Sequence, residues 1–112
     1  MGQDRTVLIV DVSQLIDNLL RVAITQRRKI RFRYNGKERI AEPHDYGMQG
    51  GKARLLVYQT GGQSGSGRLP NWRWTDVSRM EELEILSETF AGNRPAPSGR
   101  HQKWDQLFLR VS

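Results

Sequence analysis

The 112-residue sequence has no cysteine, only four prolines and no long apolar run, and these shortages exclude several classes of protein. Without cysteine the chain forms no disulfide scaffold, thiolate-zinc site or iron–sulfur cluster, and it has no thiol nucleophile. No apolar run approaches the roughly 18 residues that a membrane-spanning helix needs. We therefore expect a soluble, cytoplasmic protein that has no membrane partner.

The hydrophobic content is also modest. Hydrophobic residues make up 37% of the chain, and the mean hydropathy is −0.66. This is enough for one small core, whereas two cores would leave each half of the chain too small to bury much surface. We expect a single domain over residues 1–112.

Apolar residues recur at spacings of three and four near the start of the chain, which predicts a helix with one apolar face. These residues are Val12, Leu15, Ile16, Leu19, Leu20, Ala23 and Ile24. Asp11 is expected to cap the helix, and Gln14 stands where a capping box returns the hydrogen bond. The helix should run over about residues 12–26, and the three bases that follow suit the negative end of its dipole.

A period of two replaces the helical spacing at Ile30, which predicts a strand that ends at Tyr34. Asn35 and Gly36 are typical of a type I′ turn, so residues 38–42 are expected to pair back as a second strand. Together these residues predict a β-hairpin.

Pro43 is expected to end the second strand and to leave residues 42–47 as a polar connector. The glycine-rich residues 61–67 are expected to form a flexible loop, and they lack the Gly-Lys-Thr or Gly-Lys-Ser of a phosphate-binding P-loop. Three more strands are predicted, at residues 53–59, 71–76 and 83–85.

This order of elements predicts a mainly β fold with an N-terminal helix, as a small, strongly bent, five-stranded antiparallel barrel. Its parts are an N-terminal strand and helix over residues 6–27, the barrel over residues 28–90 and an extension over residues 91–112. Apolar residues 6–10 and 107–111 could cross back over the barrel or pair with an edge of another subunit. A homodimer is therefore one hypothesis.

The net charge of +6 is confined to one segment. Residues 27–39 contain seven bases and one acid, whereas the other 99 residues contain eleven bases and eleven acids. Arg31 and Arg33 are expected side by side on the open face of the hairpin, with Lys37 and Arg39 near the turn and partner strand. Such a surface favours phosphate binding, and the alternative is a solvated charge cluster that only keeps the protein soluble.

Four arginines are the main candidates for binding, because guanidinium groups hold phosphate with two hydrogen bonds and stack on bases. Arg31, Arg33 and Arg39 would capture the ligand electrostatically. Arg73 would orient a phosphate. The simpler interpretation of any one exposed arginine on a strand is protection of a sheet edge.

The polar connector contributes two further candidates, His44 and Tyr46. Tyr46 could stack on a base or cap one end of the barrel. His44 has an ordinary pKa suited to acid–base work, although a hydrogen bond within its own loop is the simpler interpretation.

No catalytic or metal site is expected. His44 and Asp45 are adjacent, so on an extended chain they point in opposite directions, and a zinc site needs three or four convergent ligands. Ser64 and Ser66 lie in the flexible loop, where a nucleophile would be poorly held. We expect neither enzymatic activity nor a cofactor.

Several short motifs, in order, carry a family resemblance. Ala23-Ile24 ends the helix, a strand ends in Tyr34, and Arg39 stands three residues before Glu42-Pro43. Later motifs are Leu56-Val57, Arg73, Arg79-Met80 and Leu83-Glu84-Ile85-Leu86 through to Phe90. In this order the segment 23–90 resembles the WYL domain family, although Arg54-Leu55-Leu56 stands where that family has Trp-Tyr-Leu.

The resemblance implies an Sm-like five-stranded β-barrel that senses nucleic acid or nucleotide-like ligands in bacterial transcription regulation or defence. It points to Arg39, Arg73 and Arg79 as binding residues, although Arg79 could instead pair with Glu81 or Glu82. No helix-turn-helix precedes the segment, so the resemblance implies a lone sensor or adaptor module rather than a promoter-binding regulator.

Charge and resemblance together predict a non-enzymatic module that binds single-stranded DNA or RNA, or a phosphate-bearing nucleotide, on an arginine-rich barrel face. The alternative is a protein-interaction or dimerisation adaptor whose basic face docks an acidic partner.

Overall fold

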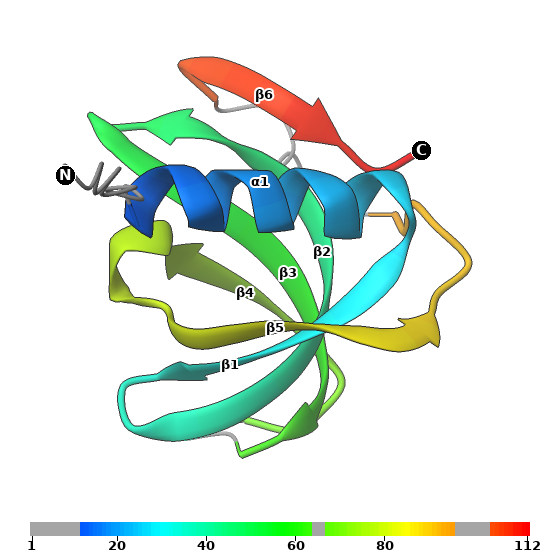
Figure 1. The fold of residues 1–112 in the computed structure, drawn as a ribbon. Helices are drawn as coiled ribbons and strands as arrows, with labels where there is room; N and C mark the ends of the chain where they lie inside the picture. Colours follow the sequence, from blue (N-terminus) through cyan, green and yellow to red (C-terminus); the bar gives the residue numbers. More distant parts are fainter. Residues whose placement is uncertain (1–11, 64–66, 96–103) are drawn as a thin grey trace, which may run out of the picture.

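One helix lies across an antiparallel sheet of six strands in the computed structural model, which describes residues 12–63, 67–95 and 104–112 (Figure 1). The elements in chain order are α1 (Val12–Thr25), β1 (Arg28–Tyr34), β2 (Lys37–Gln49), β3 (Lys52–Gly62), β4 (Asn71–Asp76), the short 3₁₀ helix η1 (Val77–Arg79), β5 (Glu81–Thr89) and β6 (Gln106–Arg110). The predicted helix and the mainly β character are therefore confirmed.

The first hairpin forms where the sequence predicts it. Asn35 and Gly36 have φ values of 54° and 74°, the left-handed conformation that a type I′ turn needs. β1 pairs antiparallel with β2, and Ile30 lies opposite Ala41. The turn lies at the end of the molecule away from β6 (Figure 1).

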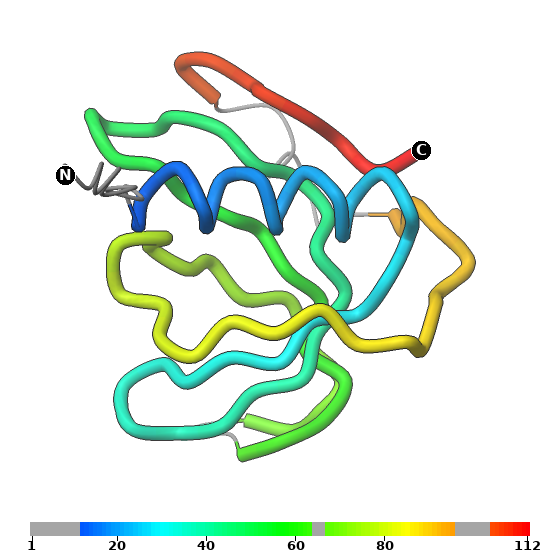
Figure 2. Tube along the Cα trace, in the orientation of Figure 1, coloured from blue at the N-terminus to red at the C-terminus, as the bar shows by residue number. Residues whose placement is uncertain are grey.

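The strands follow the order β4-β3-β2-β1-β5, and β6 pairs with β2 beyond the point where β1 leaves it. β4 and β5 are the two ends of this path, and no pairing among the described residues joins them. The antiparallel sheet is thus shown, whereas its closure into a barrel is not. Figure 2 shows the bent course of the chain around the core.

The expectation of a polar connector over residues 42–47 is wrong. These residues form the middle of β2, the longest strand, and every one of them is buried. Pro43 does not end the strand. It lies opposite Val57 of β3, and on the other edge of β2 it falls between the stretch that pairs with β1 and the stretch that pairs with β6, so neither of those strands needs its missing N–H. A register shift between Pro43 and Asp45 absorbs the local irregularity.

The C-terminal extension crosses back over its own sheet, one of the two outcomes expected for it. β6 runs antiparallel to β2, with Leu109 opposite Tyr46, and the Val111 N–H donates to the His44 carbonyl at 2.9 Å. The predicted strand at residues 6–10 and the Asp11 cap lie outside the described residues, as do residues 64–66. The predicted loop over residues 61–67 begins later than expected, because Gly61 and Gly62 belong to β3.

The core lies between α1 and the sheet. The helix buries Leu20, Ala23 and Ile24, which lie in one cluster with Ile30 and Phe32 of β1. Spacings of three and four place these helical side chains on one face, as predicted. Within the described ranges, α1 is too short to span a membrane and no other helix reaches its length.

Candidate anion-binding site

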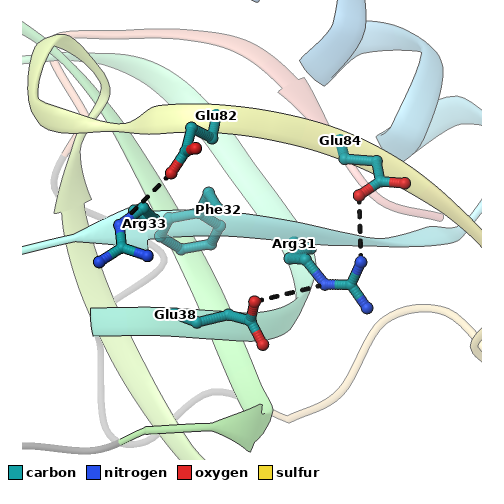
Figure 3. A pocket seen from close by; sticks show the side chains of 6 residues that line it. All are labelled: Arg31, Phe32, Arg33, Glu38, Glu82 and Glu84. Atoms are coloured by element: carbon teal, nitrogen blue, oxygen red, sulfur yellow. Dashed lines mark hydrogen bonds and ion pairs between the residues drawn. The ribbon is translucent and has the colours of Figure 1, made fainter. Parts of the chain in front are cut away.

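Arg31 and Arg33 stand on the open face of β1, as predicted, but each has an acidic neighbour. Arg31 Nη1 lies 3.1 Å from Glu84 Oε1 of β5, and its Nε lies 3.9 Å from Glu38 Oε1 of β2. Arg33 Nε lies 3.3 Å from Glu82 Oε2. Figure 3 shows these side chains alternating in sign across the three strands.

We call this set the outer ladder: Arg31, Arg33, Glu38, Glu82 and Glu84. With Phe32 it lines a shallow hollow of about 220 Å³. Three acids face two bases there, so the rows of guanidinium groups expected from the sequence are neutralised. The count of charge along the chain missed this because two of the acids come from β5, some fifty positions away.

Arg39 belongs to the opposite face of the hairpin. It lies directly across from the buried Phe32, and opposed residues of an antiparallel pair share a face. Its guanidinium carbon lies 4.9 Å from the centre of the Tyr34 ring, within the range of a cation–π contact. Arg39 is therefore separated from the outer ladder by the sheet itself.

Arg79 approaches the same aromatic ring from η1. Its guanidinium carbon lies 5.0 Å from the Tyr34 ring centre, and its Nη2 donates to the Asn35 side-chain oxygen. The Tyr34 hydroxyl accepts a hydrogen bond of 2.9 Å from the Asp76 N–H, which fixes the ring. Arg79 thus contacts the hairpin turn, and Glu82 pairs with Arg33 instead.

Arg73 completes a group of like charges. It lies on β4 opposite Val57, and its guanidinium group lies close to Gly67. A side chain at Gly67 would place its Cβ 3.8 Å from Arg73 Nη2. Burial lowers the pKa of Arg39, and the positive charges of Arg73 and Arg79 lower that pKa further. We call Arg39, Arg73 and Arg79 the arginine cluster.

Two buried polar atoms at this end of the sheet lack a hydrogen-bond partner among the described residues. One is Arg39 Nε, a donor, and the other is Gln59 Oε1, an acceptor. Gln59 is fully buried, and its side-chain amide donates to the Gly61 and Gln63 carbonyls, so Oε1 is the oxygen that remains. Buried polar atoms normally have partners, so these two atoms remain able to form a hydrogen bond, as does Arg31 Nε of the outer ladder. No pattern in the sequence distinguishes Gln59 from an ordinary strand residue.

The cluster carries a net positive charge. Within the described ranges, neither Arg39 nor Arg79 forms an ion pair with a carboxylate. Three guanidinium groups from β2, β4 and η1 are thus gathered at one end of the sheet, beside the loop that begins after Gly62. These are the three arginines to which the sequence resemblance points.

His44 is fully buried in β2 and packs against aromatic rings. Its ring centre lies 4.8 Å from that of Trp72 and 5.5 Å from that of Phe90. Its Nε2 lies 3.4 Å from Glu42 Oε1. The simpler interpretation from the sequence was a hydrogen bond to its own segment, and the structure shows that contact.

Tyr46 is also part of the core. Its hydroxyl donates to Asp17 Oδ1 at 2.7 Å, and its ring packs edge-on against Phe108 at 5.1 Å. Burial raises the pKa of Tyr46, and the hydrogen bond and charge of Asp17 raise it further. A tyrosine held in this way is only 4% exposed and offers no ring face to a base from solvent.

Two ion pairs that no pattern in the sequence indicates attach the C-terminal extension to β2. Arg94 donates to both carboxylate oxygens of Glu42, at 2.7 and 3.0 Å, and Arg110 donates to both oxygens of Asp45, at 3.0 and 3.1 Å. Burial alone would raise the pKa of Glu42, but hydrogen bonds from Arg94 and His44 outweigh it, so that pKa lies below its ordinary value. The expectation that residues 42–47 form a polar connector gave no reason to predict that the carboxylates of Glu42 and Asp45 are buried and paired.

Within the described residues, no group of three or more His, Cys, Asp or Glu side chains is arranged to hold a metal ion. No protein-family model, curated protein or solved structure matches this chain. Function is therefore argued from the geometry of the site.

Proposed function

We propose that this protein binds a phosphate-bearing ligand, a nucleotide or single-stranded nucleic acid, at the arginine cluster. The observation that carries the proposal is the gathering of three like charges from separate elements, two of them against the Tyr34 ring. Binding is the whole activity proposed, and no bond of the ligand is broken.

Like charges held together raise the free energy of the empty site, and a bound anion removes that cost. Burial lowers the pKa of Arg39 most, and repulsion by Arg73 and Arg79 lowers that pKa further. Guanidinium groups suit phosphate because each offers two parallel N–H donors to two phosphate oxygens. A phosphate among three arginines would be held from three directions.

The buried Gln59 Oε1 favours a ligand that also carries a hydrogen-bond donor. Inorganic phosphate at neutral pH offers chiefly acceptors, whereas a nucleotide adds hydroxyl and amino donors beside its phosphate. This supports a nucleotide or a nucleic-acid strand over a bare anion.

The resemblance to the WYL domain family is consistent with this proposal, and the Sm-like barrel is part of it. We infer that the bent sheet β4-β3-β2-β1-β5 acts as a partly open barrel whose arginine-rich end receives the ligand. A role in transcription regulation or defence follows only from the resemblance.

An acidic protein partner is the competing occupant. It would approach as a broad surface and contact exposed bases, whereas Arg39 Nε and Gln59 Oε1 are buried atoms. Burial of these two atoms is the reason to favour the phosphate ligand.

The test compares two triple variants with equal loss of charge. The first is Arg39→Ala/Arg73→Ala/Arg79→Ala. The matched control removes the acid-paired bases as Lys29→Ala/Arg31→Ala/Arg33→Ala, in which Lys29 pairs with Glu88 at 2.8 Å. Fluorescence anisotropy would measure a labelled adenosine nucleotide, single-stranded DNA and RNA, and duplex DNA, with polyglutamate as a competitor.

The cluster variant should bind the nucleotide or the single strand more than roughly 1,000-fold more weakly, since three hydrogen bonds to charged groups are lost and each contributes at least about 1.5 kcal/mol. The control should lose less than about 3-fold, because its bases are already paired. Equal losses in both variants would reduce the site to a general cation surface. Displacement by polyglutamate as effective as by nucleotide would favour the acidic protein.

A further inference from the structure

α1 carries two apolar stripes, and the sheet covers only one of them. Ile16, Leu20, Ala23 and Ile24 pack on the sheet. The second stripe, which we call the outer stripe, is Val12, Leu15, Leu19 and Val22. Val12 is 67% exposed, Leu15 47% and Val22 40%.

A helix on the surface of a small domain normally turns polar side chains to solvent. α1 lies at the surface, in front of the sheet (Figures 1 and 2). A second apolar stripe along it is therefore surface that another segment is expected to bury.

The spacing of the outer stripe is that of a helix–helix seam. Its residues follow one another at intervals of three, four and three, the repeat that places side chains along a line between two paired helices. The order Val, Leu, Leu, Val is also the same in both directions, about a centre at Asp17. Two antiparallel copies related by a two-fold axis would set Val12 against Val22 and Leu15 against Leu19.

The charges on α1 permit this pairing. Asp17 and Arg21 are its two charged residues, and they pair with each other at 3.0 Å. Asp17 also accepts from Tyr46, on the side of the helix that faces β6. The outer stripe is flanked by uncharged residues, so two copies meet no like charges there, and antiparallel helices also bring opposite dipole ends together.

We propose that the outer stripe is the contact between two copies of this chain, paired through antiparallel α1 helices. The self-complementary sequence is what selects a second copy over an unrelated partner, since a two-fold interface must match its own reverse. This pairing is independent of the proposed ligand site and differs from the pairing of strand edges.

The dimer is expected to be weak. A helix of 14 residues is about 21 Å long, and a single helix face buries less than the roughly 800 Å² per partner of a standard interface. A dissociation constant on the order of 10–100 µM is therefore expected, and the protein should change from monomer to dimer with concentration.

The absence of cysteine makes a direct test possible. Chains with Val12→Cys and with Val22→Cys, one of them isotope-labelled, are mixed at about ten times the expected dissociation constant and oxidised with copper phenanthroline. The antiparallel pairing predicts disulfides chiefly between the two different chains, because residues 12 and 22 face each other. Residue 12 of one copy lies roughly 15 Å from residue 12 of the other, beyond the reach of a disulfide.

The matched control pairs Gln14→Cys with Val22→Cys, since Gln14 is exposed on the polar side of the same helix. Disulfides between the different chains should be at least 10-fold fewer with Gln14→Cys than with Val12→Cys. Sedimentation of Leu15→Arg against Gln14→Arg gives a second readout, with only the former held monomeric at high concentration.

A disulfide between two Val12→Cys chains would indicate a parallel pairing and overturn the proposal. A wild-type protein that stays monomeric at about 500 µM, well above the dissociation constant proposed, would also overturn it and assign the stripe to residues 1–11 or to another protein.

Discussion

The outer ladder and the arginine cluster use the same side chain in opposite ways. In the ladder, Arg31 and Arg33 each lie within 3.3 Å of a carboxylate oxygen. In the cluster, Arg39 lies near two further arginines, and its pKa is lowered first by burial and then by their charges. Arginines of the first kind are paired with acids from neighbouring strands, whereas those of the second kind are gathered with one another.

The alternation of one strand pair produces this difference. Arg31 lies opposite Ile40 and shares its face, while Arg39 lies opposite Phe32 and shares the buried face. Residues that are neighbours in the sequence are thus placed on opposite sides of the sheet. On one side β5 supplies glutamates, and on the other η1 and β4 supply arginines. A basic run in the sequence therefore need not form one basic surface.

The largest expected effect is a loss of stability when the buried carboxylate that pairs with Arg94 is removed. Glu42→Gln removes the bidentate partner of Arg94 from a position that is 2% exposed. The free energy of unfolding should fall by about 2 kcal/mol at pH 7. Because the folded pKa of Glu42 lies below its ordinary value, this stabilisation is present above about pH 4.3 and is lost as pH falls through the folded pKa.

Urea unfolding of the wild type and Glu42→Gln at pH 7 and at low pH measures both the loss of stability and its dependence on pH. The matched variant is Glu84→Gln, which removes an exposed partner of Arg31 and should cost about 0–1 kcal/mol. If the wild type and Glu42→Gln differ as much at low pH as at pH 7, the Glu42 carboxylate is not the group that stabilises the pair.

The second effect separates the shape of the guanidinium from its charge. Arg39→Lys keeps the positive charge but loses the planar donor pair and the flat contact with Tyr34. Nucleotide affinity should fall about 10-fold, equivalent to roughly 1.4 kcal/mol. Arg31→Lys should leave it unchanged, as titration by anisotropy or calorimetry would show. Equal affinity of wild type and Arg39→Lys would mean that the cluster acts only as a point charge.

The smallest expected effect is a pair of stability changes with opposite signs in two arginine variants. Arg73→Gln removes a like charge beside Arg39, so the part of its effect that depends on salt should stabilise the ligand-free protein by about 0.5 kcal/mol at low salt. Arg31→Gln should make it less stable by a similar amount, since Arg31 faces two acids. Thermal unfolding at low salt and at about 0.5 M salt measures this, because screening should bring the two variants together. Destabilisation by both variants would remove the comparison on which the proposed function rests.

The hairpin shows how far sequence reasoning reaches. The alternation of residues 30–34 and the Asn35-Gly36 turn act over a few positions, and the structure has the strand and the turn where the sequence predicts them. The helix also starts at Val12, and it ends at Thr25, one residue before the predicted end. These features depend on local conformational preference and on burial of one face, both of which the local sequence expresses.

The middle of β2 shows where such reasoning fails. Proline, histidine and acidic residues at positions 42–45 are typical of a loop, yet this segment is the most buried part of the sheet. It is a strand because β3 pairs along it and because Arg94 and Arg110 of the C-terminal extension neutralise its carboxylates. Those partners lie 52 and 65 positions away, and no local pattern indicates them.

The sequence by itself determined the helix, the hairpin, the basic character of residues 27–39 and the arginines that are candidates for binding. Only the tertiary structure decided which of those arginines meet acids and which meet one another. The reason is physical: secondary structure follows from neighbours along the chain, whereas the charge felt by a side chain depends on the elements that the fold packs against it. The pairing of β5 with β1 neutralises Arg31 and Arg33, and the approach of β4 and η1 gathers Arg39, Arg73 and Arg79.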